Sequence, residues 1–324
     1  MGTHFVSRSR AEAPNGVAPA RRGAHRAPGS WTRRELLRGG VVVLLGVSGA
    51  ELLAACSGAA TASPTPVAAS SAPPPSPRIP EVSLTATETT FDAPETLSAG
   101  IVRVSLENKG GLTSSLNVLR LREGKTFDEV KADFPRPDAQ LASLSLIFEM
   151  FGGCTGTPPG QRCSVVLDLA AGTYALLSRA SGRSAGIVKQ LVVSQASGAS
   201  APEPAADVTV SLKDGIAPVV PATVKGATTW KVTNDGQVPH VFQIWRFKSG
   251  KSAADLLSYF ATAGGSGPVP AEVVAGSGVL SPGKRAWFTS ELAPGEYLDA
   301  CTVTGRNPPA DHMNEGETAK ITVG

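Results

Sequence analysis

The sequence predicts an all-β protein made of two tandem Greek-key β-sandwiches, each with one short helix. The chain contains an internal repeat, because residues 108–134 align with residues 234–260 at a constant offset of 126 and without a gap. In both stretches bulky apolar residues alternate with others, as in strands that are buried on one face. Turn-forming residues separate these short segments, and about 245 residues follow the N-terminal low-complexity region, enough for two ordinary domains. A β-rich unit that occurs twice is typical of antiparallel sandwiches.

The first 55 residues are predicted to be an export signal. The pair Arg33-Arg34 precedes an apolar run at residues 41–47, and the segment 53–56 reads Leu-Ala-Ala-Cys. This order resembles a twin-arginine signal followed by a bacterial lipobox, which implies cleavage before Cys56 and acylation of its thiol. The apolar run is too short to span a bilayer. We therefore expect an extracytoplasmic lipoprotein anchored to the cell membrane by a lipid on Cys56; the alternative is an ordinary N-terminal anchor helix.

Removal of this signal changes the charge balance of the protein. The whole chain has 30 Lys and Arg against 27 Asp and Glu. The signal holds 8 of the basic and 3 of the acidic residues, so 22 basic and 24 acidic residues remain, a formal charge of about −2. The basic pI thus belongs to the signal, and we expect no nucleic-acid partner. Residues 56–80 are rich in Ala, Ser and Pro and are predicted to be an extended tether.

The repeat also sets the domain boundaries. Domains are predicted at residues 81–194 and 207–324, with an Ala/Ser/Pro-rich linker at residues 195–206 that disfavours one large barrel. In each copy the central strand ends at a Gly, after which a short amphipathic helix begins with capping-box spacing. The residues with this spacing are Thr126 with Glu129 and Ser252 with Asp255.

The cysteines and histidines suggest where chemistry could occur. Two of the four His lie in the signal, so the mature part keeps only His240 and His312. Cys154 and Cys163 flank a Gly/Pro-rich turn and form a plausible disulfide in an oxidising compartment. Cys301 is then the unpaired thiol. A thiolate with two imidazoles suits copper in a trigonal arrangement with a weak axial ligand.

The placement of these residues resembles the C-terminal half of a cupredoxin of the plastocyanin and azurin type. Residues 295–301 read Gly-x-Tyr-x-x-x-Cys and end in Cys301, His312 lies in the next loop, and His240 follows an Asn-x-Gly turn at 234–236. The resemblance covers the second copy throughout and the first copy as scaffold only. It implies that His240, Cys301 and His312 bind copper.

The axial ligand is left open by the sequence. The resemblance implies a Met a few residues after the His, but here Met313 directly follows His312. Adjacent residues on an extended backbone point to opposite sides. Glu317 is the alternative, and its oxygen would favour Cu(II) and lower the reduction potential. The spacing of eleven from Cys301 to His312 is longer than in the compact blue-copper loop, so the loop must fold back.

The first copy serves as an internal control. Ser114 stands where His240 stands in the second copy, and Ser178 stands where Cys301 stands. No His precedes the closing strand of the first copy, which is therefore predicted to hold no metal. The scaffold can exist without a site.

The expected function follows from these observations. We expect a membrane-tethered tandem cupredoxin-like lipoprotein that binds one copper ion for electron transfer or copper holding, with a redox protein as partner. The sequence has no phosphate loop, no paired zinc-type cysteines and no G-x-S-x-G elbow, and we expect no enzyme. The alternative is a non-catalytic binding or adhesion module that uses the scaffold without metal.

Overall fold

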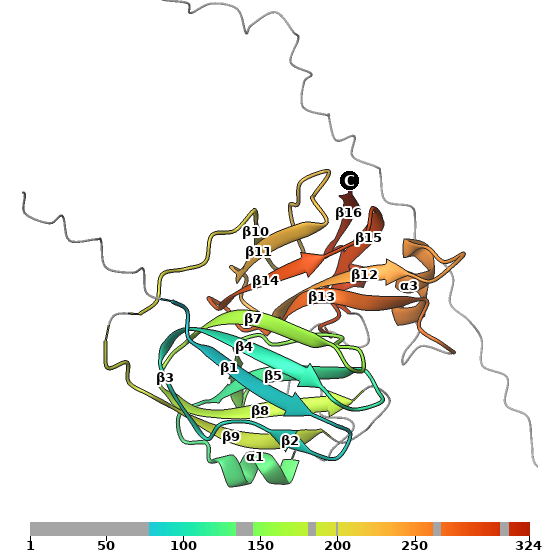
Figure 1. Cartoon of the computed structure of the whole chain (residues 1–324). Coiled ribbons are helices and arrows are strands. Elements are labelled where there is room, and N and C mark those ends of the chain that lie inside the picture. The colour runs from blue at the N-terminus through green and yellow to red at the C-terminus, as the bar shows by residue number, and fades with distance from the viewer. Residues whose placement is uncertain (1–77, 134–144, 181–185, 199, 262–266, 305–310) are drawn as a thin grey trace, which may run out of the picture. The chain divides into compact units, whose positions relative to one another are not determined.

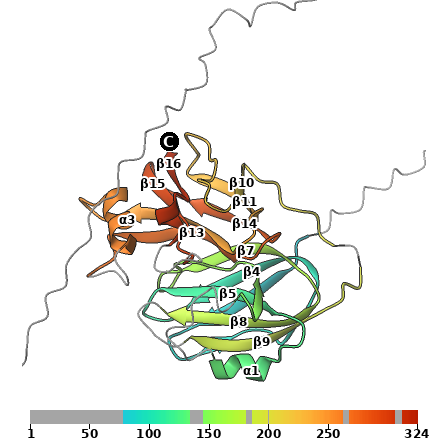
Figure 2. The same ribbon diagram turned by 180° about the vertical axis from the view of Figure 1, so that it is seen from behind.

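The computed structural model describes residues 78–133, 145–180, 186–198, 200–261, 267–304 and 311–324 (Figures 1 and 2). These residues belong to one compact unit. The predicted signal, Cys56 with its predicted acylation, and the predicted tether up to residue 77 lie outside the described residues. No described helix has the length and apolar character that crossing a bilayer requires.

The first repeat is built mainly from short strands. Its elements are β1 (Glu81–Ala86), β2 (Phe91–Asp92), β3 (Thr96–Ser98), β4 (Gly100–Asn108), β5 (Ser114–Leu121), α1 (Phe127–Asp133), β6 (Phe148–Met150), β7 (Arg162–Leu169), β8 (Gly172–Ala180) and β9 (Ile187–Ser194).

The second repeat follows the same plan. Its elements are β10 (Val208–Leu212), β11 (Ala227–Asn234), β12 (His240–Phe247), α3 (Ala253–Ala261), β13 (Ala271–Leu280), β14 (Arg285–Glu291), β15 (Gly295–Ala300), the 3-10 helix η1 (His312–Glu315) and β16 (Thr318–Val323). The chain is thus mostly β, as predicted.

The strands form three sheets, and one of them runs through both repeats. The seven-stranded sheet has the order β10-β11-β14-β7-β4-β1-β2, beside a four-stranded sheet β13-β12-β15-β16 and a five-stranded sheet β3-β9-β8-β5-β6. The two repeats meet where β14 pairs with β7, with Ala286 opposite Leu167 and Phe288 opposite Val165 (Figure 1). Each of these strands would otherwise be an edge with unpaired N–H and C=O groups. The linker therefore does not keep the repeats apart, and two separate Greek-key sandwiches stay a prediction.

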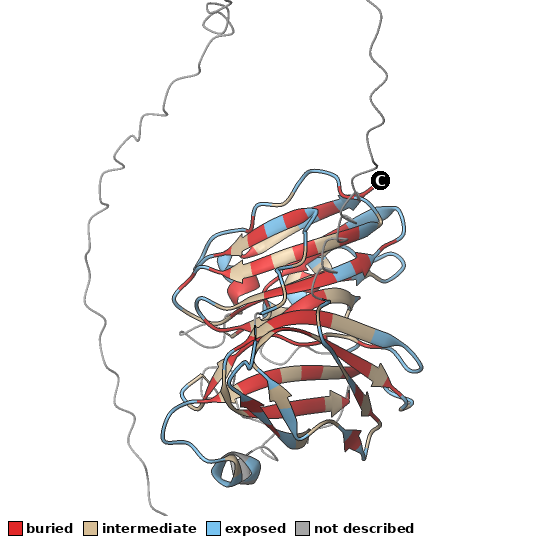
Figure 3. Cartoon of the chain, turned by 60° about the vertical axis from the view of Figure 1, so that its left-hand side comes forward, coloured by how far each residue is buried: buried red, intermediate tan, exposed pale blue. Residues whose placement is uncertain are grey.

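The main core lies between the facing sheets, where buried residues line the strands (Figure 3). In the second repeat Trp230 of β11 and Phe288 of β14 pack against Phe242 of β12 across the layers, with ring centroids 5.3–6.2 Å apart. Trp287 of β14 is buried in a separate cluster with Val166 of β7. The reason is the period of two along β14, which turns Trp287 to the face opposite Phe288.

Both predicted capping boxes are present. The Thr126 N–H donates to Glu129 Oε2 at 2.9 Å, and the Glu129 N–H donates back to Thr126 Oγ1 at 3.3 Å. In α3 the Ser252 N–H donates to Asp255 Oδ2 at 2.9 Å, and the Asp255 N–H donates to Ser252 Oγ at 3.4 Å. The two reciprocal pairs satisfy backbone donors that the first helical turn leaves free.

The predicted disulfide joins Cys154 to Cys163 in a glycine-rich segment that contacts the second repeat. Gly153 lies in this segment with φ 154°, and its N–H donates to the Ser277 carbonyl of β13 at 2.9 Å. A Cβ on Gly153 would collide with the Leu116 carbonyl of β5. A Cβ on the neighbouring Gly152 would lie 2.6 Å from the Ser277 carbonyl of β13, so glycines here let the backbone lie close both to β5 and to the second repeat.

Candidate metal centre

Four buried polar side chains converge at one end of the second repeat. His240 begins β12, Cys301 directly follows β15, His312 begins η1, and Glu317 directly precedes β16. β15 pairs with both β12 and β16, and these pairings bring the ends of the three strands together. None of the four residues is more than 4% exposed. Residues up to 77 positions apart in the sequence thus meet in a site that water does not reach freely.

The structure brings together the three residues that the sequence singled out. The Cys301 Sγ lies 3.6 Å from His312 Nδ1 and 3.9 Å from His240 Nδ1, and the two Nδ1 atoms are 3.3 Å apart. Bonds of about 2.0 Å from a metal to nitrogen and about 2.3 Å to sulfur place ligand atoms about 3.3–3.8 Å apart in tetrahedral or trigonal geometry. The observed separations fit one metal ion bound between these atoms.

Glu317 completes the group. Its Oε2 lies 2.8 Å from His240 Nδ1 and 3.3 Å from His312 Nδ1, and its Oε1 accepts the Gly215 N–H at 2.8 Å. Burial would raise the pKa of Glu317, but the hydrogen bonds from His240, His312 and Gly215 outweigh it and lower the pKa to about 2. The carboxylate is therefore charged at neutral pH. Ligand atoms of Glu317 and the three predicted residues all lie within 4.8 Å of one another.

Met313 lies elsewhere. Its side chain is buried in an apolar cluster with Trp245, Leu256 and Leu298, between α3 and the four-stranded sheet. His312 and Met313 are consecutive residues of a 3-10 helix, in which neighbours project about 120° apart. Of the two axial candidates that the sequence left open, Glu317 is the one that the structure places against the imidazoles.

The surroundings of the Cys301 thiol determine whether it is protonated. The Val241 N–H donates to Sγ at 3.5 Å, but burial dominates and raises the pKa of the thiol above its ordinary value. A bound cation deprotonates a coordinating thiol outright. The group therefore offers a metal cation four electron-pair donors. They are two imidazoles, one carboxylate and the sulfur of Cys301, which becomes a thiolate when it binds a metal.

The ring of His240 contacts a carboxylate at each nitrogen. Nδ1 faces Glu317 within the group, whereas Nε2 lies 2.8 Å from Oδ1 of Asp214, outside it. Burial would lower the pKa of His240, but the hydrogen bonds to Glu317 and Asp214 raise it above the ordinary value. Sequence reasoning missed Asp214. The offset of 126 could have identified it, because Glu88 holds the equivalent position in the first repeat.

The first repeat has the same architecture without these ligands. Ser114 and Ser178 occupy the positions equivalent to His240 and Cys301, and their hydroxyl oxygens lie 3.4 Å apart. The repeat alignment is therefore correct in space as well as in sequence. Within the described part of the chain, the group in the second repeat is the only cluster of His, Cys, Asp and Glu that has a metal-like arrangement.

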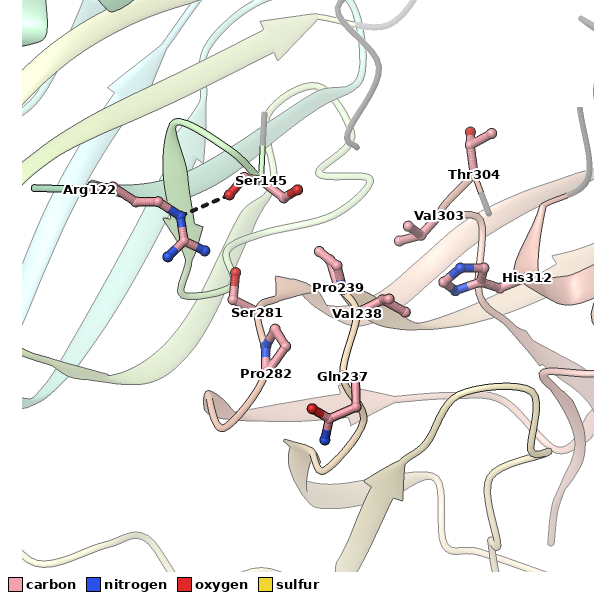
Figure 4. A pocket seen from close by; sticks show the side chains of 10 residues that line it. All are labelled: Arg122, Ser145, Gln237, Val238, Pro239, Ser281, Pro282, Val303, Thr304 and His312. Carbon is pink, nitrogen blue, oxygen red and sulfur yellow. Dashed lines mark hydrogen bonds between the residues drawn. The ribbon is translucent and has the colours of Figure 1, made fainter. Parts of the chain in front are cut away.

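A cavity of about 200 Å³ adjoins the group (Figure 4). Val238, Pro239 and His312 line it from the second repeat, and Arg122 and Ser145 line it from the first. The Arg122 side chain donates from Nε to the Ser145 carbonyl at 2.8 Å. Of the four residues in the group, His312 is the one that lines this cavity.

Comparisons with known proteins give matches among solved structures only. No family model matches the sequence, and no curated protein matches it significantly. Among solved structures, the chain is similar to reduced auracyanin from the photosynthetic bacterium Roseiflexus castenholzii, with 23% identity over 36% of this chain and 95% of that chain and a TM-score of 0.27. It is also similar to auracyanin A, a "blue" copper protein from Chloroflexus aurantiacus, with 19% identity over 36% of this chain and 99% of that chain and a TM-score of 0.24.

A third match covers both repeats. A copper nitrite reductase from Nitrosomonas europaea is 11% identical over 76% of this chain and 94% of that chain, with a TM-score of 0.23. Identities and scores this low carry no information on function.

Proposed function

We propose that the second repeat binds one copper ion through His240, Cys301 and His312, with Glu317 as an oxygen ligand, and that the protein transfers single electrons or holds copper. The observation that carries this proposal is the convergence of four buried donor atoms within 4.8 Å from four separate chain segments. Isolated buried polar groups are costly, so a buried cluster of electron-pair donors is best explained by a cation that they share.

The donor set favours copper over other metals. Thiolate and imidazole ligands in a trigonal arrangement with a weak axial ligand are typical of copper sites used for electron transfer. When bound, copper would supply a one-electron redox couple. The negative charges of the Cys301 thiolate and the Glu317 carboxylate together balance Cu(II) but exceed the charge of Cu(I). We therefore expect these residues to stabilise the oxidised form and lower the potential.

The protein contributes positioning and exclusion of water. Three of the four residues, His240, Cys301 and Glu317, lie at a strand end or directly beside one, so the sheet holds their backbones in place. Their burial keeps solvent away from the ligand atoms. A rigid, dry site changes little on oxidation or reduction, which favours electron transfer. His312 also lines the adjoining cavity of about 200 Å³.

The proposal for the whole chain includes export and anchoring. We propose that Cys56 is acylated after cleavage of the signal, so that the tether holds the folded repeats at the outer side of the cell membrane. Each repeat would be a Greek-key, cupredoxin-like sandwich, and only the second would bind copper. The partner would be a redox protein, and the chain would not act as an enzyme.

Copper titration tests this function directly. The purified chain titrated with Cu(II) should develop an intense visible thiolate-to-copper band that saturates at one copper per chain. Cys301→Ser should abolish the band, whereas Ser178→Ala, the matched change in the first repeat, should leave it intact. Stoichiometric copper with an empty visible spectrum, together with a His240→Ala variant that behaves as the parent, would rule out this site and leave a metal-free binding module.

A further inference from the structure

Asp214 lies just outside the group, on a turn that follows β10. Lys213 and Ile216 form an isolated antiparallel β-bridge that closes this turn. Asp214 Oδ1 lies 2.8 Å from His240 Nε2. The same oxygen accepts the N–H groups of Gln237 at 2.9 Å and Val238 at 3.4 Å. An oxygen that already accepts two backbone donors is a carboxylate acceptor, so His240 Nε2 must carry the proton and donate it.

We propose that Asp214 is a positioning residue for the copper ligand His240, in that its carboxylate fixes the proton on Nε2, orients the ring and leaves Nδ1 to the metal. This inference rests on the proposed function. A carboxylate that accepts the outer N–H of a ligating imidazole fixes its tautomer and raises its basicity. Nδ1 is the nitrogen that faces Cys301, His312 and Glu317, in agreement with this assignment.

The loop before His240 leaves room for the contact. A Cβ on Gly236 would collide with Asp214 Oδ1 and would lie 2.8 Å from His240 Nε2. The requirement for glycine at this position is therefore one of space. Any side chain at position 236 would lie between the carboxylate and the imidazole and would separate them.

The same turn also holds the fourth member of the group. The N–H of Gly215, the residue after Asp214, donates to Glu317 Oε1 at 2.8 Å. Two adjacent residues of one turn thus contact two of the four candidate ligands. The Asp214 side chain is 43% exposed, so solvent weakens its charge effect on the group, whereas the hydrogen bond to the buried ring remains local.

The first repeat shows which contacts of Asp214 serve only to hold the loop and which involve the copper ligand. Glu88, at the equivalent position, accepts the N–H groups of Gly111 at 2.6 Å and Leu112 at 2.9 Å. These are the positions equivalent to Gln237 and Val238, so both repeats use a carboxylate to hold this loop. In the first repeat the residue equivalent to His240 is Ser114, which has no imidazole. The contact between Asp214 and the His240 imidazole is therefore additional to the loop-holding role that the two carboxylates share.

The test compares Asp214→Asn and Asp214→Ala with the matched change Glu88→Gln in the full chain. In the metal-free protein, ¹H–¹⁵N NMR should show an exchange-protected His240 Nε2–H, which Asp214→Ala should expose. In the copper-loaded protein, Asp214→Asn should reduce the preference for Cu(II) over Cu(I) about tenfold, which raises the one-electron potential by about 59 mV. Asp214→Ala should weaken Cu(II) binding about 10- to 100-fold. Glu88→Gln should change none of these quantities.

The outcomes distinguish the two proposals. A parent chain that binds copper, with Asp214 variants that keep the parent potential, copper affinity and NMR signal, overturns the role of Asp214 and leaves the copper site standing. Equal changes in the Asp214 and Glu88 variants would also overturn it, because loop support alone would then explain them. A parent chain that forms no thiolate–copper band overturns the proposed function and the role of Asp214 with it.

Discussion

Replacement of Glu317 by Gln would remove one negative charge from the candidate site and keep the size of the side chain. Glu317 Oε2 lies 2.8 Å and 3.3 Å from the two Nδ1 atoms, and all four ligand atoms lie within 4.8 Å. A charge separation of about 4 Å, longer than a metal–oxygen bond of about 2 Å, gives a lower bound: at an effective dielectric constant of about 20 the Coulomb energy is about 4 kcal/mol. Reduction changes the copper charge by one unit, so the same energy corresponds to a rise in potential of about 170 mV.

A redox titration monitored at the visible band would measure this shift. The control is Glu315→Gln, which removes the same charge from an exposed residue of η1 only two positions away. We expect little change in the control, because solvent screens exposed charges. If Glu317→Gln has the same reduction potential as the parent chain, or if both variants shift the potential equally, the Glu317 carboxylate does not act at the metal. Either result would refute the reasoning.

Three further predictions concern the anchor, the disulfide and the close backbone packing at Gly153. Incorporation of labelled palmitate should be lost in Cys56→Ala, and retained labelling would refute the predicted anchor. A thiol assay of the denatured, acylated chain should count one reactive thiol, Cys301, whereas three would show that the Cys154–Cys163 bridge does not form. Gly153→Ala should lower the free energy of unfolding by about 2–4 kcal/mol, because φ is 154° and the added Cβ meets a carbonyl. Gly198→Ala, where a Cβ meets nothing within 4 Å, should have little effect in the same denaturant titration.

Local patterns account for the parts of this protein that the sequence predicted well. The capping boxes of both helices need only residues three positions apart, and the disulfide joins cysteines across one turn. The repeat predicted that Ser114 and Ser178 replace His240 and Cys301, and the structure places these two serines side by side. The few His and Cys residues outside the signal, together with the resemblance to a cupredoxin, identified three members of the group.

By itself, the sequence determined the β repeats and their helices, because both depend on short-range periodicity, and its resemblance to a cupredoxin implied the three residues that converge. Only the tertiary structure decided which groups surround them. The pairing of β7 with β14 joins edge strands more than a hundred residues apart, and no local pattern specifies such a partner. The direction of each side chain along η1 separates Met313 from His312, and the turn after β10 brings Asp214 to His240. Contacts of this kind arise from the relative placement of distant backbone segments, which residue spacing does not encode.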